Sequence, residues 1–114
     1  MEADCIFCKI ASGAIPGAFA HRDRDVIAIA DVNPQAPTHL LVMPVAHVPN
    51  LAALVASGDA KLLRQIFDVA ARLGAKQGPD GFRAVINTGR EGGQSVDHLH
   101  VHVLAGRQME WPPG

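Results

Sequence analysis

The sequence has little net charge, and this absence narrows the range of partners. Its 114 residues include 10 Lys and Arg against 11 Asp and Glu, which gives a formal net charge of -1 at pH 7, with a pI near 6.6. Proteins that bind nucleic acid or an anionic membrane surface through charge need a basic patch or stripe. We therefore expect no nucleic-acid partner and no membrane partner, and instead a small molecule or another protein.

The sequence also lacks long apolar runs, internal repeats and low-complexity tracts. No segment approaches the 18 or so apolar residues of a membrane-spanning helix, and the N-terminus lacks the basic start and apolar stretch of a signal peptide. With 48% apolar residues among 114, the chain is long enough for one hydrophobic core and too short for a second. We expect a single domain over 1–114, in the cytoplasm.

Cysteine is scarce as well, since the chain contains only Cys5 and Cys8. In a reducing compartment such a C-x-x-C pair indicates metal or thiol chemistry before a structural disulfide. A redox dithiol normally follows a strand in a βαβ unit, and no such unit is predicted here. A structural metal site and a pair of buried reduced thiols are the main alternatives on these residues.

Histidine, in contrast, is concentrated: three of the six histidines, His98, His100 and His102, stand on alternate positions of one apolar segment. A β-strand would place the three imidazoles on one face about 7 Å apart, with Leu99 and Val101 on the other face. Three imidazoles side by side forgo about 1.5 to 3 kcal/mol of apolar burial at each position. A purely structural role is therefore disfavoured, because every ring also leaves polar atoms to satisfy.

Two kinds of chemistry fit these imidazoles. Three in a row on a straight strand span about 13 Å, whereas zinc holds its nitrogen ligands at about 2.1 Å, so at most two of them could bind one ion. Alternatively, His100 attacks phosphorus and His102 donates a hydrogen bond to a phosphate oxygen, without a metal in the chemical step. Both alternatives are open on the residues alone.

Hydrophobic periodicity predicts three helices and five strands, which indicates an α+β fold. The helices are expected over 5–11, 49–55 and 60–77. The strands are expected over 19–21, 26–30, 38–43, 82–87 and 98–104. A proline-containing loop at 31–37 and a glycine-rich loop at 88–94 connect them.

The His-x-His-x-His strand followed by Val103-Leu104 resembles the histidine triad family of nucleotide hydrolases and transferases. The resemblance extends over nearly the whole chain, through Cys5-Ile6-Phe7-Cys8-Lys9-Ile10, the segment 31–44 with Pro34-Gln35-Ala36-Pro37-Thr38-His39, Gly92-Gly93-Gln94-Ser95-Val96, Gly106-Arg107-Gln108-Met109 and Trp111-Pro112-Pro113-Gly114. The tail is similar to the Hint branch, which hydrolyses nucleoside phosphoramidates. The resemblance implies a mostly antiparallel five-stranded sheet with one long and two short helices, and a homodimer in which two sheets form one ten-stranded sheet.

The resemblance also implies roles for individual residues. His100 would be the nucleophile that forms a nucleotidyl-histidine intermediate, His102 would contact the α-phosphate, and His39 would support them. Ser95 is placed to donate to the leaving atom. The substrate-binding positions would be Asp31, Val32, Asn87, Gly93, Gln94, Ser95, His100, His102 and Trp111. Turn-forming roles for Asp31 and Asn87, and a packing role for Trp111, are the structural alternatives.

Some members of the family with such a cysteine pair bind zinc, so the resemblance implies a structural zinc held by Cys5, Cys8, His47 and His98. The implied reaction is cleavage of the P–N bond of purine nucleoside 5′-phosphoramidates such as AMP or GMP amides, with no metal in the chemistry. Hydrolysis of dinucleoside polyphosphates or nucleotidyl transfer, and a non-catalytic nucleotide-binding scaffold, are the alternatives.

Two residues depart from the family's usual pattern, Asp97 and Ala30. Asp97 stands where an aromatic or apolar residue is common, and Ala30 replaces a bulkier neighbour near the nucleotide edge. Strand alternation places Asp97 on the face of Leu99, away from the imidazoles. We therefore expect a larger effect on local packing than on the chemistry.

Overall fold

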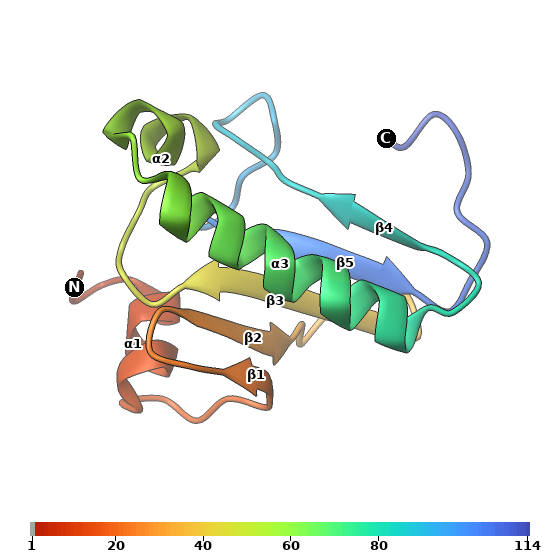
Figure 1. The fold of residues 1–114 in the computed structure, drawn as a ribbon, viewed down its shortest axis with the longest axis horizontal. Helices are drawn as coiled ribbons and strands as arrows, with labels where there is room; N and C mark the ends of the chain where they lie inside the picture. The colour runs from red at the N-terminus through yellow and green to blue at the C-terminus, as the bar shows by residue number, and fades with distance from the viewer. Residues whose placement is uncertain (1) are drawn as a thin grey trace.

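The computed structural model describes residues 2–114, and its five strands form one antiparallel sheet beside three helices (Figure 1). The strands are β1 (Phe19–Arg22), β2 (Val26–Ala30), β3 (Thr38–Pro44), β4 (Phe82–Val85) and β5 (Val101–Ala105). The helices are α1 (Ile6–Ser12), α2 (Leu51–Ser57) and α3 (Ala60–Gln77). The sheet order is β1-β2-β3-β5-β4, with antiparallel pairing throughout. The predicted α+β class and five-stranded sheet are confirmed.

The long helix α3 covers one face of the sheet and runs across β3 and β5 (Figure 1). Asp59 caps its first turn by accepting a hydrogen bond from the Leu62 N–H at 3.0 Å. The apolar stripe of α3 includes Ile66 and Val69, which pack on Val42 of β3 and Val101 of β5. Burial of these side chains fixes which residues of β3 and β5 face α3, and the alternate residues then face the opposite side.

The short helix α1 packs on that opposite side of the sheet. Phe7 and Ile10 of α1 join Ile27 of β2 and Leu41 and Met43 of β3 in a second, smaller hydrophobic cluster. The helix begins at a cysteine cap, since the Sγ of Cys5 accepts a hydrogen bond from the Cys8 N–H at 3.4 Å. Leu41 is opposite His102 in the β3–β5 register, so the face that α1 shares is also the face of the histidines.

The last strand begins three residues later than expected, at Val101 instead of His98. The Leu99 N–H donates to the carbonyl of Val48 at 2.7 Å, so this segment is tied to the loop that follows β3. Smaller differences occur at β4, which ends at Val85, and at α2, which begins at Leu51. The faces of the histidine segment nevertheless agree with the prediction, because Leu99 and Val101 lie in the core under α3.

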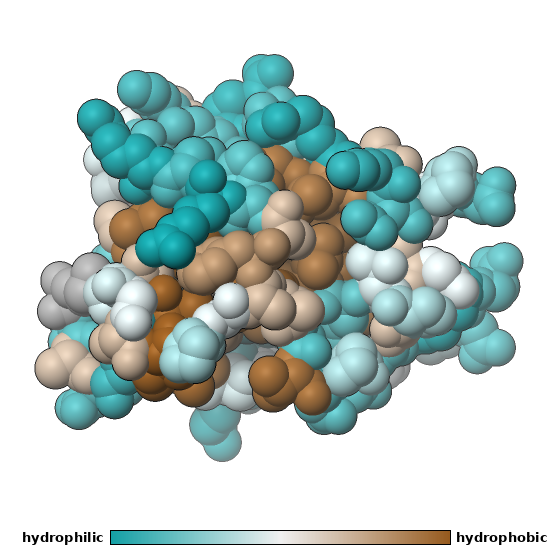
Figure 2. Space-filling model, turned by 90° about the horizontal axis from the view of Figure 1, so that it is seen from below, coloured by the Kyte–Doolittle hydropathy of each residue, from teal (hydrophilic) through white to brown (hydrophobic). Residues whose placement is uncertain are grey.

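Some apolar area stays uncovered at the surface. Seen from below, hydrophobic residues form a band across the middle of the molecule, and hydrophilic residues lie on both sides of it (Figure 2). Within residues 2–114, no helix has the length and hydropathy that spanning a bilayer requires.

Candidate active site and metal cluster

Five of the six histidines gather in two clusters on the α1 side of the sheet. The histidine cluster consists of Asp31, His39, His100 and His102. The thiol cluster consists of Cys5, Cys8, His47 and His98. The strand pattern alone grouped His98 with His100 and His102, whereas the structure turns the His98 side chain to the cysteines.

His100 is buried and has one hydrogen-bond partner that decides its tautomer. Its Nδ1 lies 2.8 Å from the carbonyl oxygen of His98. A carbonyl can only accept, so Nδ1 must carry the proton and donate. In the neutral ring, Nε2 is then an unprotonated nitrogen with a free lone pair, which is the form of imidazole that attacks an electrophile.

His39 and His102 form a relay that starts at the main chain. The Gln35 N–H donates to His39 Nδ1 at 3.0 Å, so the proton of the neutral His39 ring is on Nε2. His39 Nε2 in turn lies 2.9 Å from His102 Nδ1, which must accept. The remaining proton of His102 is therefore on Nε2, as an N–H donor. The ring of His102 lies beside that of His100, with centroids 5.0 Å apart.

Asp31 completes the histidine cluster at the start of the loop between β2 and β3. Its Oδ2 lies 3.3 Å from His39 Nε2, and its Oδ1 accepts a hydrogen bond from the Asn33 N–H at 2.9 Å. Burial lowers the pKa of His102, the neighbouring His100 and His39 lower it further, and the Asp31 carboxylate acts in the opposite direction. His102 is therefore neutral at pH 7, as the relay requires.

The glycine-rich loop before the histidines is held together by two amide side chains. Asn87 donates to the Gly92 carbonyl at 2.7 Å. Gln94 accepts from the Gly89 N–H at 3.0 Å and donates to the Pro49 carbonyl at 2.7 Å. Because these side chains bond to the loop itself, the groups left for a ligand are main-chain atoms of the loop. Contact of Asn87 and Gln94 with a substrate stays a prediction.

The other predicted substrate positions are at the surface. Val32 is fully exposed at the tip of its loop, Trp111 is 84% exposed in the C-terminal tail, and Ser95 is exposed in the glycine-rich loop. Gly93 has a φ of 80°, a conformation in which glycine is strongly favoured. The structure describes one chain, and within residues 2–114 no hydrogen bond joins Ser95 or Trp111 to His100. Their roles in binding stay predictions.

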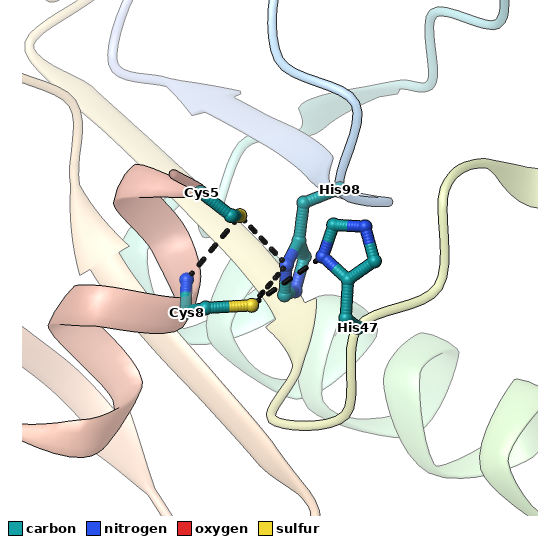
Figure 3. A group of neighbouring side chains, drawn as sticks. All are labelled: Cys5, Cys8, His47 and His98. Atoms are coloured by element: carbon teal, nitrogen blue, oxygen red, sulfur yellow. Dashed lines mark hydrogen bonds between the residues drawn. The ribbon is translucent and has the colours of Figure 1, made fainter. Parts of the chain in front are cut away.

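The thiol cluster joins three segments that are far apart in the sequence (Figure 3). Cys5 and Cys8 come from the start of α1, His47 from the loop after β3, and His98 from the segment before β5. His98 Nδ1 lies 3.3 Å from the Sγ of Cys5 and 3.5 Å from that of Cys8, and His47 Nδ1 lies 3.4 Å from the Sγ of Cys8. The four ligand atoms all lie within 4.8 Å of one another.

This donor set fits a tetrahedral zinc ion. Zn–S bonds of about 2.3 Å and Zn–N bonds of about 2.1 Å place neighbouring S and N ligands about 3.6 Å apart, close to the distances observed. His98 Nε2 donates to the Pro44 carbonyl at 2.8 Å, which leaves Nδ1 unprotonated and aimed at the thiols. Burial lowers the pKa of His98, so its ring is neutral, and burial raises the pKa of the Cys5 thiol, so metal binding must displace its proton.

Asp31, His39 and His102 also lie close enough together to resemble a metal site. Their protons argue against one. Because the Gln35 N–H occupies His39 Nδ1, the proton of the His39 ring is on Nε2, the atom that would have to ligate the ion. A metal there would need a deprotonated ring or a broken hydrogen bond. In the thiol cluster, in contrast, the proton of His98 lies on its outer nitrogen, so the ring turns a lone pair to the thiols.

Sequence reasoning misplaced Asp97 and missed three groups that shape the site. Asp97 precedes β5, so strand alternation does not apply to it, and it lines a cavity with Cys5 and His47 instead of the core beside Leu99. The missed groups are the ring of Phe7, the carbonyl of Pro44 and the N–H of Gln35. Phe7 had a signal, because it stands between the two cysteines. The two main-chain groups had none, since every residue carries such atoms.

Comparisons with known proteins agree on one family. Residues 12–109 match the HIT domain. An uncharacterized HIT-like protein from Synechocystis is 46% identical over the full length of both chains. Protein pkiA from Dictyostelium discoideum is 47% identical over 97% of this chain and 90% of its own.

Solved structures are similar over the same range. A HIT family hydrolase from Legionella pneumophila superposes with a TM-score of 0.92 at 44% identity, over 97% of this chain and all of that one. A histidine triad protein from Clostridium difficile gives a TM-score of 0.89 at 40% identity, over 96% of each chain. The similarity therefore includes the whole sheet and both clusters' segments.

Proposed function

Since the chain belongs to the HIT domain family, we propose that it is a nucleotide hydrolase that cleaves the P–N bond of purine nucleoside 5′-phosphoramidates, with His100 as the nucleophile. The observation that carries the proposal is the proton arrangement at His100. Its Nδ1–H is bonded to the His98 carbonyl, so Nε2 is free to attack. The hydrolase named among the similar structures supports the reaction class.

In the proposed reaction, His100 Nε2 forms a bond to the α-phosphorus and the P–N bond breaks. The leaving nitrogen keeps the bonding electron pair and takes up a proton from solvent water, through the Ser95 hydroxyl, so that a neutral amine departs. The His102 Nε2–H, oriented through His39 and Gln35, donates to a phosphate oxygen as negative charge develops. Water then attacks phosphorus and gives up one proton to the solvent, while the P–N bond to His100 breaks with its electron pair returning to Nε2, so that AMP and the neutral ring are released.

The loops around the histidine cluster supply the substrate contacts in this proposal. The Asp31 carboxylate is held in position by its contact with His39 Nε2. A carboxylate in such a position can accept hydrogen bonds from a ribose diol. Val32 provides an exposed apolar surface for a base. The main-chain N–H groups around Gly93, and the Ser95 hydroxyl, are proposed to face the phosphate and the leaving group.

We further propose a homodimer in which two sheets continue into one. The strands at the edges of the sheet are β1 and β4, and an unpaired edge readily accepts another strand. Phe82 on β4 is 40% exposed, and the tail with the exposed Trp111 is tied to β4 because Arg83 donates to the Glu110 carbonyl at 2.8 Å. An exposed aromatic residue on β4 and another in the tail attached to β4 favour that edge as the interface.

The thiol cluster is proposed to hold a structural zinc ion through Cys5, Cys8, His47 and His98. A bound zinc would link α1, the loop after β3 and the segment before β5, and so contribute to stability. Both cysteines are free thiols, which suits the reducing cytoplasm that we propose as the location. None of the proposed chemical steps at His100 involves this ion.

The test of the reaction uses two substrates and a search for the intermediate. The purified protein is given adenosine 5′-phosphoramidate or a diadenosine polyphosphate, and AMP release is followed by chromatography. We expect faster cleavage of the P–N substrate, and acid-quenched samples should carry an AMP adduct on the peptide that contains His100, seen by mass spectrometry. Preferred P–O–P cleavage would support the polyphosphate hydrolase instead. Nucleotide binding without turnover of either substrate would support a scaffold.

A further inference from the structure

The carbonyl that fixes the tautomer of His100 belongs to a residue outside the sheet. The β3–β5 ladder pairs Val101 with Val42 and runs from there toward Ala105, so His98 lies before its first pair. Within the described chain, the main chain here is held by the Leu99 N–H, which donates to Val48. The other attachments of His98 are made by its side chain, through Nε2 to Pro44 and through Nδ1 to the thiols.

Phe7 provides a second connection between the two clusters. It is 6% exposed and stands on α1 between Cys5 and Cys8. Its ring meets the His98 ring edge-on, with centroids 5.8 Å apart and an interplanar angle of 87°. It meets the His100 ring in the same manner, at 5.1 Å and 74°. The same side chain therefore packs against a member of the thiol cluster and against the nucleophile.

We propose that Phe7 and the main chain of His98 are positioning residues for His100, so that the thiol cluster holds the proposed nucleophile in its attacking tautomer and orientation. The inference rests on the proposed function of His100. The imidazole of His100 has two neutral tautomers, and rotation about its side-chain bonds would separate Nδ1 from the His98 carbonyl. The Phe7 edge blocks that rotation on one side, and the carbonyl holds the proton on Nδ1. A thiol cluster that holds Phe7 and His98 in place therefore also fixes the tautomer and the orientation of the His100 ring.

The first experiment replaces Phe7 and compares two readouts. Phe7→Leu keeps an apolar side chain but removes the ring edge, and we expect kcat for adenosine 5′-phosphoramidate to fall about 10-fold or more, as a displacement of about 1 Å can cost 100-fold. KM should stay within about 2-fold, since ground-state binding does not use the lone pair. In the substrate-free protein, ¹⁵N NMR of the His100 ring should change from one protonated nitrogen to a mixture of tautomers.

Ile10→Ala is the matched control. Ile10 lies one turn further along α1 in the same hydrophobic cluster and is similarly buried. This variant should lower the thermal stability without changing kcat or the His100 ring nitrogens. Phe7→Tyr keeps the ring and should recover most of the lost kcat. If Phe7→Leu and Ile10→Ala lose equal kcat, or if Phe7→Leu leaves the ring nitrogens unchanged, the inference is wrong.

A second variant leaves Phe7 in place and works even if Phe7→Leu does not fold. Cys5→Ser weakens the thiol cluster, yet serine can still cap α1. We expect the His100 ring nitrogens of this variant to show mixed tautomers. The wild type should show the same mixture after chelation of its zinc, and added zinc should restore the single tautomer. An unchanged His100 spectrum in both samples would overturn the coupling. The spectra are recorded without substrate, so they test the coupling independently of the reaction. The phosphoramidase proposal would instead be contradicted if the wild type did not turn over the substrate.

Discussion

The two clusters are built from similar residues but present opposite atoms at their centres. In the thiol cluster, the Pro44 carbonyl takes the proton of His98 on its outer side, so the lone pair points inward to the cysteines. In the histidine cluster, the Gln35 N–H occupies the outer nitrogen of His39, so the proton points inward to His102. The lone pair of His98 can bind a cation. The N–H of His39 instead orients His102, whose own Nε2–H can then donate to an anion. The difference is made by one carbonyl and one N–H of the main chain.

The largest effect is expected from removing the nucleophile of the histidine cluster. His100→Ala should lower kcat for adenosine 5′-phosphoramidate by on the order of 10⁴-fold or more, because no covalent intermediate can form. AMP affinity, measured by calorimetry, should change little. His21→Ala, a histidine of the β1 strand outside both clusters, is the control and should keep full activity. Retained turnover in His100→Ala would show that His100 is not the nucleophile and that the histidine cluster is not the catalytic one.

The thiol cluster is tested by its metal content. Cys5→Ser should lower zinc affinity by more than about 100-fold. Loss of a residue that only hydrogen-bonds to a metal ligand already costs about 10- to 100-fold, and loss of a ligand itself should cost more. Elemental analysis of the purified protein should show zinc in the wild type and little in the variant, together with a lower melting temperature. His102→Gln should keep its zinc. Equal zinc in Cys5→Ser and the wild type would exclude the site, and loss of zinc in His102→Gln would mean that the clusters are not distinct.

Acid should destabilise the histidine cluster through His102. Burial lowers the pKa of this ring below its ordinary value of 6.5, so in the window beneath 6.5 the unfolded chain binds more protons than the folded one. The free energy of unfolding should therefore fall as the pH drops through 6.5 toward the folded pKa. Denaturant unfolding at several pH values measures this slope. In His102→Gln, whose amide oxygen can still accept from His39, the slope should be smaller, and an equal slope would contradict the assignment.

The smallest effect concerns the charge of Asp31. Its carboxylate raises the pKa of His102 against the larger lowering by burial, so Asp31→Asn should lower that pKa further. An NMR titration of the His102 ring protons gives the direction. Asp23→Asn is the matched control, because Asp23 pairs with His21 on the hairpin at 2.6 Å and not with His102. A rise in the His102 pKa in Asp31→Asn would show that Asp31 does not act through its charge.

Much of the fold followed from local patterns in the sequence. The stripe that includes Leu63, Ile66 and Ala70 predicted α3 with its observed bounds, because a long amphipathic period has few other solutions. The alternation of His100 and His102 with Val101 and Val103 predicted which side chains share a face. The start of β5 was wrong by three residues. Periodicity could not detect that the Leu99 N–H leaves the ladder for Val48, since alternating faces persist without ladder pairing.

The sequence by itself determined which residue types were available: a C-x-x-C pair, alternate histidines on one strand face, and the apolar stripes that form the sheet and α3. The family resemblance already grouped His98 with the cysteines and His39 with His102, and the tertiary structure brings each group within contact distance. Only the tertiary structure decided which nitrogen of each ring holds the proton, through Pro44, Gln35 and the His98 carbonyl. The physical reason is that an imidazole can donate or accept on either side, and main-chain groups that every residue carries select between these states only when folding brings them within hydrogen-bond distance.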